Sequence, residues 1–228
     1  MRIASRKTLP MLASVAAILV AADALGIVVS HLRGGYHRMS IFNVDQGGNA
    51  PAYYFAVLIL LLAGLLAVVS TARRAAGERD RPYWTGLAVL ALCFSVDEAV
   101  GIHDRLAEYA GRILRIPVAV WTYAWVAPYA ALMIIVVVIY FRFFMSLRRR
   151  IRFLMGLAFA VYVAGAIVAE SIGGYFARTM SMRSAPYQLM TTLEWALEVA
   201  GVLVAIYAVM TYIDEELGGL ELRTGSSG

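Results

Sequence analysis

Six long apolar stretches occupy most of this chain and constrain its fold more than any other feature. They cover residues 9–30, 51–71, 83–104, 118–141, 151–175 and 187–213. Each is close to the ~20 residues that an α-helix needs to cross a hydrocarbon core. The chain is 61% hydrophobic and only 15% charged, whereas soluble domains carry about 25% charged residues. We therefore predict an all-α, polytopic membrane protein, a bundle of six transmembrane helices.

The residues outside these stretches are too few to form a soluble catalytic domain. We interpret residues 1–213 as a single transmembrane helical domain and 214–228 as a short cytoplasmic tail, which ends in the linker-like sequence GSSG. The first apolar stretch follows basic residues, as in a signal peptide, but it is longer than the apolar region of a typical signal peptide. We expect it to be retained as the first membrane helix.

Basic residues indicate how the helices are oriented. They are concentrated before the first helix, in the 72–82 loop and in the 142–152 segment, and they are fewer in the intervening loops. Cytoplasmic loops of membrane proteins carry an excess of Lys and Arg. The pattern therefore predicts a multi-pass protein of the bacterial inner (plasma) membrane with both termini cytoplasmic.

Composition also excludes several classes of function. The net charge of +5 comes from arginines at helix ends, where they contact anionic lipid, so we expect no nucleic-acid partner. The only cysteine is Cys93, which excludes disulfide frameworks and thiolate clusters. Three histidines are too few for a multi-haem cytochrome with bis-His ligation. The only lysine, Lys7, excludes a retinal Schiff base in a late helix.

Acidic residues within the predicted spans form a pattern of depth. Four different helices place carboxylates about 8 to 16 Å below their outer ends, at 1.5 Å per residue. These residues are Asp23, Asp97, Glu98, Glu170, Glu194 and Glu198. Random placement would scatter them, so we predict a carboxylate cluster in the outer leaflet.

The energetic cost of these groups restricts where their side chains point. One carboxylate at a helix centre costs roughly 2.5–3.5 kcal/mol. All of them facing lipid would cost on the order of 15 kcal/mol, as much as the whole stability of a domain. No Lys or Arg lies at that depth to pair with them. The sequence therefore predicts that a cation, a proton or water is their partner.

The third apolar stretch contains the densest group of polar residues, SVDEAVGIHD at 95–104. On an ideal helix Asp97 and Asp104 differ by about 20°, with Gly101 beside them, whereas Glu98 and His103 point to either side. Either Asp97, Gly101 and Asp104 line the site, or the helix unwinds near Gly101 and His103 turns inward. A simpler interpretation makes His103 an interfacial residue and leaves the acids as protonated, interhelical hydrogen-bond donors.

The last two stretches combine acids with small residues. Glu194 and Glu198 are spaced i, i+4, and small residues at 201, 205 and 208 continue their face. Such a face is typical of a helix packed closely inside a bundle. Two ionised groups at this spacing repel, so either a cation lies between them or one keeps its proton. Glu170 lies beside the small residues 165, 169 and 173, which packing alone would also explain.

The first outer loop carries further polar residues. Pro51 marks the start of the second helix. Residues 45–49 (DQGGN) are typical of a turn and could instead form a lid over the acidic cluster. His31 ends the first helix on the same side, within reach of the cluster, and His37 follows in the loop.

Four segments together resemble a group of uncharacterised bacterial six-helix membrane proteins. They are NVDQGGNAPAYYF at 43–55, SVDEAVGIHD at 95–104, VAESIGGYF at 168–176 and TLEWALEVAG at 192–201. The resemblance covers most of the chain and implies the six-helix architecture without an activity. Members often carry a second acid where Trp195 stands and a loop acid near Gly47, so this chain has fewer carboxylates than the group's pattern.

Three functions fit the predicted cluster. The first is an ion-handling transporter or channel for protons or a cation, because an acidic bundle interior is the usual form of such a site. The second is an intramembrane metal-dependent enzyme, a hydrolase or an oxidoreductase. The third is a structural or accessory membrane protein. The sequence leaves self-association into a homo-oligomer open, and the lipid bilayer is the expected environment.

A metal-binding interpretation uses all of the acids and one histidine. Oxygen-rich ligation favours a divalent cation such as Ca²⁺, Mn²⁺ or Mg²⁺ over Zn²⁺ or Fe²⁺. The candidate metal ligands are Asp23, Asp97, Glu98, His103, Asp104, Glu170, Glu194 and Glu198.

Overall fold

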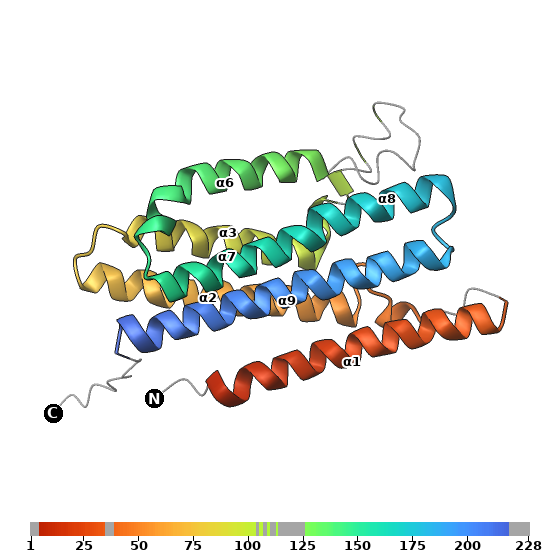
Figure 1. Cartoon of the computed structure of the whole chain (residues 1–228), viewed down its shortest axis with the longest axis horizontal. Coiled ribbons are helices and arrows are strands. Elements are labelled where there is room, and N and C mark those ends of the chain that lie inside the picture. The colour runs from red at the N-terminus through yellow and green to blue at the C-terminus, as the bar shows by residue number, and fades with distance from the viewer. Residues whose placement is uncertain are drawn as a thin grey trace.

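In the part of the chain that the structure describes, six antiparallel helical passages form the fold (Figure 1). The computed structural model describes residues 5–34, 39–103, 105–106, 109, 113 and 126–218. Within these residues the secondary structure is entirely helical. The all-α prediction is therefore confirmed for the part of the chain that is described.

The helices follow the predicted stretches and extend most of them at both ends. They are α1 (Ser5–Leu32), α2 (Ala50–Ala75), α3 (Arg81–Val100), α6 (Val126–Ser146), α7 (Arg149–Val163) and α9 (Ala185–Glu216). After α7 the same passage continues through a π-helical segment, η2 (Ala164–Ala169), into α8 (Glu170–Thr179), and a short 3₁₀ turn, η1 (Ser40–Phe42), precedes α2.

Five of the passages in the described residues are long and apolar enough to cross a membrane. They are Lys7–Leu32, Ala50–Ala75, Arg81–Val100, Arg149–Thr179 and Ala185–Glu216. The fourth predicted stretch, 118–141, is described only from residue 126, and there the apolar helix Ala130–Ser146 is shorter.

The helix ends are fixed by local signals that the sequence carries. Asn49 caps α2 by accepting a hydrogen bond from the backbone N–H of Ala52 at 3.2 Å, and Pro51 occupies the first turn. At the other end of α2, Arg73 makes two hydrogen bonds to Asp80, at 2.9 and 2.8 Å. The indole N–H of Trp84 also donates to Asp80, at 3.3 Å. This arrangement joins α2 to α3 through a short turn.

The two ends of the bundle differ in their chemistry. We call the end that carries residues 39–49 and the turn between α8 and α9 the loop end. The opposite end, with residues 76–80 and 147–148, is the arginine end, where α1 begins and α9 finishes (Figure 1). Ion pairs at the arginine end join Arg148 to Glu216 and Arg150 to Glu215.

The hydrophobic core is best developed toward the arginine end. Val69, Trp84 and Ile213 have no exposed surface. The ring of Trp84 lies 5.2 Å from that of Phe143 and 4.5 Å from that of Tyr212, centroid to centroid. These contacts tie α3 to α6 and α9, whereas the polar groups of α3 and α9 lie toward the loop end.

Candidate functional site: a carboxylate-lined cavity

A cavity of about 330 Å³ opens among the helices toward the loop end. We call it the acidic cavity. No Lys or Arg of the described residues lines it, and its ionisable lining residues come from three helical passages and one loop. They are Asp45, Asp97, Glu98, His103, Glu170, Glu194 and Glu198. The structure thus brings five of the acids from the predicted cluster into one cavity and adds Asp45 to them.

The end of α3 is shaped by Gly101. This residue adopts a left-handed conformation with φ of 62°, and its N–H donates to the carbonyl of Asp97 at 2.7 Å. Glycine adopts this conformation without the steric cost that a Cβ imposes. The α-helix therefore ends at Val100, before the end of the apolar stretch 83–104.

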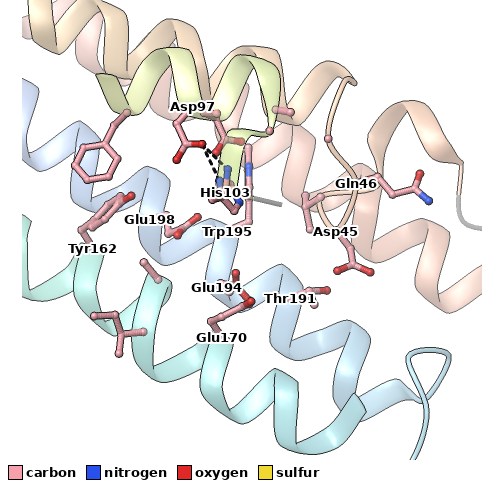
Figure 2. A pocket seen from close by; sticks show the side chains of 18 of the residues that line it. Asp45, Gln46, Asp97, His103, Tyr162, Glu170, Thr191, Glu194, Trp195 and Glu198 are labelled. Carbon is pink, nitrogen blue, oxygen red and sulfur yellow. Dashed lines mark hydrogen bonds and ion pairs between the residues drawn. The ribbon is translucent and has the colours of Figure 1, made fainter. Parts of the chain in front are cut away.

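Beyond Gly101 the chain folds back so that His103 meets Asp97 (Figure 2). The backbone N–H of His103 donates to Asp97 Oδ1 at 2.9 Å, and His103 Nδ1 lies 3.1 Å from the same oxygen. Of the two alternatives that the sequence left open, the structure has the unwound one, with His103 turned toward the cavity. Asp104 lies outside the described residues.

The π-helical segment η2 positions Glu170 opposite α9. π-Helical turns inside α-helices occur frequently at functional sites. A Cβ on Gly165 in η2 would lie 2.8 Å from the carbonyl oxygen of Glu194 and 2.9 Å from Cγ of Glu198. Only glycine therefore allows this approach, and the contact fixes η2 directly against the two glutamates of α9.

A second glycine contact reinforces the same pair of passages. A Cβ on Gly201 of α9 would lie 2.8 Å from both the backbone nitrogen and Cβ of Tyr162 in α7. Small residues at such positions let transmembrane helices approach closely. Gly165 and Gly201 thus bring α7, η2 and α9 together from both sides.

Glu170 and Glu194 meet across this interface. Figure 2 shows their side chains pointing toward each other from α8 and α9, so that the two carboxyl groups interact directly. A hydrogen bond between two carboxyl groups requires a proton on one of them. The second oxygen of Glu194, Oε2, is buried and has no hydrogen-bond partner among the described residues. A hydrogen bond within the pair would need one shared proton, and a buried acceptor remains beside it.

Glu198 lies deeper along α9, one turn from Glu194. It interacts electrostatically with Glu98 of α3 and with Glu170. Glu98, Glu170 and Glu198 therefore bring carboxyl groups from three passages into electrostatic contact.

Asp23 lies apart from this group. It is almost completely buried, with 1% of its surface exposed, but it is not a lining residue of the acidic cavity. Thr192 Oγ1 donates to Asp23 Oδ2 at 2.7 Å, and the N–H of Val44 lies 3.4 Å from Oδ1. Asp23 thus joins α1 to α9 and to the loop before α2.

The two remaining histidines do not extend the site within the described residues. His31 Nδ1 lies 2.9 Å from the carbonyl oxygen of Ile27 on its own helix, and His31 is not a lining residue of the cavity. His37 lies outside the described residues.

The loop at 43–49 contributes lining residues to the cavity. Asp45, Gln46 and Gly47 line it. The hydroxyl of Tyr187 donates to Asp45 Oδ1 at 2.8 Å, which ties the loop to α9. Asn49 Nδ2 donates to the carbonyl of Asn43 at 2.6 Å and holds the turn closed.

Sequence reasoning missed Asp45 as a site residue, together with uncharged residues that line the cavity. The repeated polar residues of the loop motif were the available signal for Asp45. The uncharged lining residues carried no comparable signal, because aromatic residues and threonines are common in membrane helices. These are Tyr162, Tyr187, Thr191 and Trp195.

With this geometry established, comparison with known proteins identifies a family. A family model described as a domain of unknown function (DUF8692) matches residues 11–213. The chain belongs to the DUF8692 family. No match was found among curated proteins or among solved structures. The family match covers every helical passage of the described fold, and it carries no activity.

The side chains of this DUF8692 protein are not arranged as a ready metal centre. Among the described residues, no group of three or more His, Cys, Asp and Glu side chains is positioned to hold a metal ion. The acids are distributed instead as the Asp97–His103 pair, the Glu170–Glu194 pair, and Glu98 and Glu198. Coordination of a metal would require these groups to move together.

Proposed function

We propose that this DUF8692 protein is an ion-handling transporter or channel of the bacterial inner membrane, and that its acidic cavity binds a proton or a cation. Five apolar helices of spanning length support a membrane location. The arginines at the opposite end from the cavity favour an orientation in which the cavity opens to the exterior and both termini are cytoplasmic.

The observation that carries this proposal is the buried Glu194 carboxyl. It interacts directly with Glu170, and its Oε2 has no hydrogen-bond partner among the described residues. A buried acceptor without a partner costs about 1–3 kcal/mol, and more when the group is charged. A cation or a second proton entering the cavity would remove that cost. The site is therefore built to gain positive charge.

The surrounding charges support the same conclusion. Six carboxyl groups line the acidic cavity, and no Lys or Arg of the described residues joins them. Within the described residues, Asp97 meets His103 and Asp45 accepts from Tyr187, whereas Oε2 of Glu194 is buried without a hydrogen-bond partner. Ionisable residues within membrane helices usually mark ion or proton pathways.

Flux through proteoliposomes tests transport. Purified protein would be reconstituted with a pH-sensitive dye inside the vesicles, and proton and divalent-cation flux would be measured after a pH or concentration jump. We expect flux in the wild type and its reduction to the rate of protein-free vesicles in Asp97→Asn, which removes a cavity charge. Asp23→Asn is the matched control, because it makes the same chemical change in a buried aspartate outside the cavity.

The outcome of this comparison separates the functions. Loss of flux in Asp97→Asn with retention in Asp23→Asn supports ion handling. Equal flux in all three proteins contradicts it and leaves a structural or accessory role for the acids.

A metal-dependent enzyme is the second candidate, and the Asp97–His103 pair favours it. A carboxylate that accepts from one nitrogen of a histidine orients the ring, as in many catalytic and metal sites. The oxygen-rich cavity would select Ca²⁺, Mn²⁺ or Mg²⁺ over Zn²⁺ or Fe²⁺. Elemental analysis of the purified protein tests this. Stoichiometric metal that is lost in Glu194→Gln/Glu198→Gln supports metal binding, and a metal-free wild type after incubation with each ion contradicts it.

A further inference from the structure

A second cavity, of about 460 Å³, adjoins the acidic cavity on the side of the arginine end. We call it the apolar cavity. It lies between α6 on one side and α2, α3, α7 and α9 on the other, and no charged residue of the described chain lines it. Both volumes fall in the range of about 300–1,000 Å³ that is usual for small-molecule sites.

The two cavities share a wall. Ile59, Phe94, Met133 and Tyr162 line both of them. These residues come from α2, α3, α6 and α7. A ligand that occupies one cavity therefore lies directly against the other.

The residues that line the two cavities match the two parts of an amphiphile, its polar head group and its alkyl chain. The acidic cavity offers carboxyl groups and an unpartnered buried oxygen, Glu194 Oε2, which suit a positively charged hydrogen-bond donor. Trp195 and Tyr162 also line it, and aromatic faces attract organic cations. The apolar cavity offers only aliphatic and aromatic surface apart from tyrosine hydroxyls, which suits an alkyl chain.

We infer that the two cavities together bind one single-chain amphiphile, with a cationic amine head group in the acidic cavity and an alkyl chain in the apolar cavity. The inference rests on the proposed cation-binding role of the acidic cavity, and it names the class of cation. An amine head group donates up to three hydrogen bonds. Its positive charge is opposite in sign to that of ionised carboxyl groups.

Binding of a defined probe tests the inference. The protein would be placed in nanodiscs of zwitterionic phosphatidylcholine and titrated with dodecylamine, dodecanol or butylamine, and adducts would be counted by native mass spectrometry. We expect a one-to-one complex with dodecylamine and much weaker binding of the other two probes. Dodecanol has the same chain without the charge, and butylamine has the same head group without the chain.

Variants on α6 test the part of the site that holds the chain. Val137 lines the apolar cavity, whereas its neighbour Val138 does not and is 69% exposed. Val137→Trp fills the cavity and should weaken dodecylamine binding by about tenfold or more, because overpacked side chains exclude a ligand chain. Val138→Trp introduces the same residue on the outer face and should leave binding unchanged.

Variants of acidic residues test the part that holds the head group. Glu194→Gln should weaken dodecylamine binding by about tenfold or more, because a buried charge partner is lost. Asp23→Asn, outside the cavity, should leave binding unchanged. Equal binding of dodecylamine by Val137→Trp and Val138→Trp would overturn the inference, as would equal binding of dodecylamine and dodecanol by the wild type.

Failure of the inference is distinguishable from failure of the proposed function. One outcome is proton or divalent-cation flux that Asp97→Asn abolishes, without a dodecylamine complex. This result contradicts amphiphile binding and supports ion handling. A dodecylamine complex that depends on Glu194 and Val137, in vesicles with no flux, supports the amphiphile site and overturns transport of protons or divalent ions.

Discussion

The loop half and the arginine half of this bundle are built from the same helices. They differ in how far polar contacts are added to apolar packing. In the arginine half, Trp84 packs against Phe143 and Tyr212 without exposed surface. In the loop half, Trp195 of α9 packs on Tyr54 and Phe55 of α2, and α9 adds polar contacts to its neighbours, such as Thr192 to Asp23 and Tyr187 to Asp45. Apolar packing in the arginine half stabilises the fold, and the loop half can therefore hold buried polar groups, among them the unpartnered Oε2 of Glu194.

Substitutions in the two halves should therefore have different effects. Changes in the arginine half should alter stability without altering the protonation of the carboxyl groups. Changes at the acidic cavity should alter the protonation of the carboxyl groups and should cost less stability than the loss of a fully buried aromatic side chain. The following experiments are ordered by the expected change in the free energy of unfolding.

The largest expected effect is at Trp84. Trp84→Ala should lower the free energy of unfolding by about 3–5 kcal/mol, because it empties a fully buried aromatic site. Circular dichroism during denaturation in mixed micelles measures the change. Phe153→Ala is the control, because Phe153 is 67% exposed and should cost far less. Comparable losses in the two variants would contradict the assignment of stability to this half.

The next effect is at the contact between η2 and α9. Gly165→Ala should lower the free energy of unfolding by about 1–3 kcal/mol, because the added Cβ overpacks the interface. It should also reduce flux, since Glu170 and Glu194 would be pushed apart.

Gly64→Ala in α2 is the matched control for this change. A Cβ there meets nothing within 4 Å. Replacing a helical glycine by alanine is favourable by roughly 0.5–1 kcal/mol where space allows. The two Gly-to-Ala changes should therefore have opposite signs, and destabilisation of equal size would show that the close approach at Gly165 is not needed.

A smaller effect is expected at the loop. Tyr187→Phe removes the hydroxyl that donates to Asp45 at 2.8 Å and should cost about 0.5–1.5 kcal/mol. Amide hydrogen exchange of residues 44–48 should become faster, because the loop loses its tie to α9. Tyr53→Phe, at a residue that is 55% exposed, is the control. Unchanged exchange in Tyr187→Phe would show that other contacts hold the loop.

The smallest effect is expected at Asp23. Asp23→Asn keeps an oxygen that can accept from Thr192, so the free energy of unfolding should fall by less than about 1 kcal/mol. Thermal denaturation measures the difference. A loss of several kcal/mol would show that the negative charge of Asp23 itself holds α1 against α9.

The helical architecture was predictable because the required apolar length is a local property. Each stretch shows its length without information from its neighbours, and five of the predicted stretches lie almost wholly within described helices of spanning length. The third helix ends before its apolar stretch does. There the left-handed turn at Gly101 competes with helix continuation, and the contact between His103 and Asp97 stabilises the turn.

The site was less predictable because depth along a helix does not determine which neighbour a side chain meets. Asp23 shares its predicted depth with the other acids, yet it bonds to Thr192 rather than entering the cavity. Asp45 reaches the cavity from a loop, through a contact with Tyr187 that is 142 residues away in sequence. Such long-range contacts leave no periodic signal in either segment.

Infrared difference spectroscopy of the carboxyl C=O stretch tests the central claim, that acids from separate passages share a proton in one cavity. Spectra would be recorded during pH titration of the wild type, Glu170→Gln, Glu194→Gln, the double variant and Asp23→Asn. We predict a protonated-carboxyl band that either single Glu-to-Gln change removes, with no further loss in the double variant and no loss in Asp23→Asn. Additive losses from Glu170→Gln and Glu194→Gln, or an unchanged band in both, would contradict the shared proton.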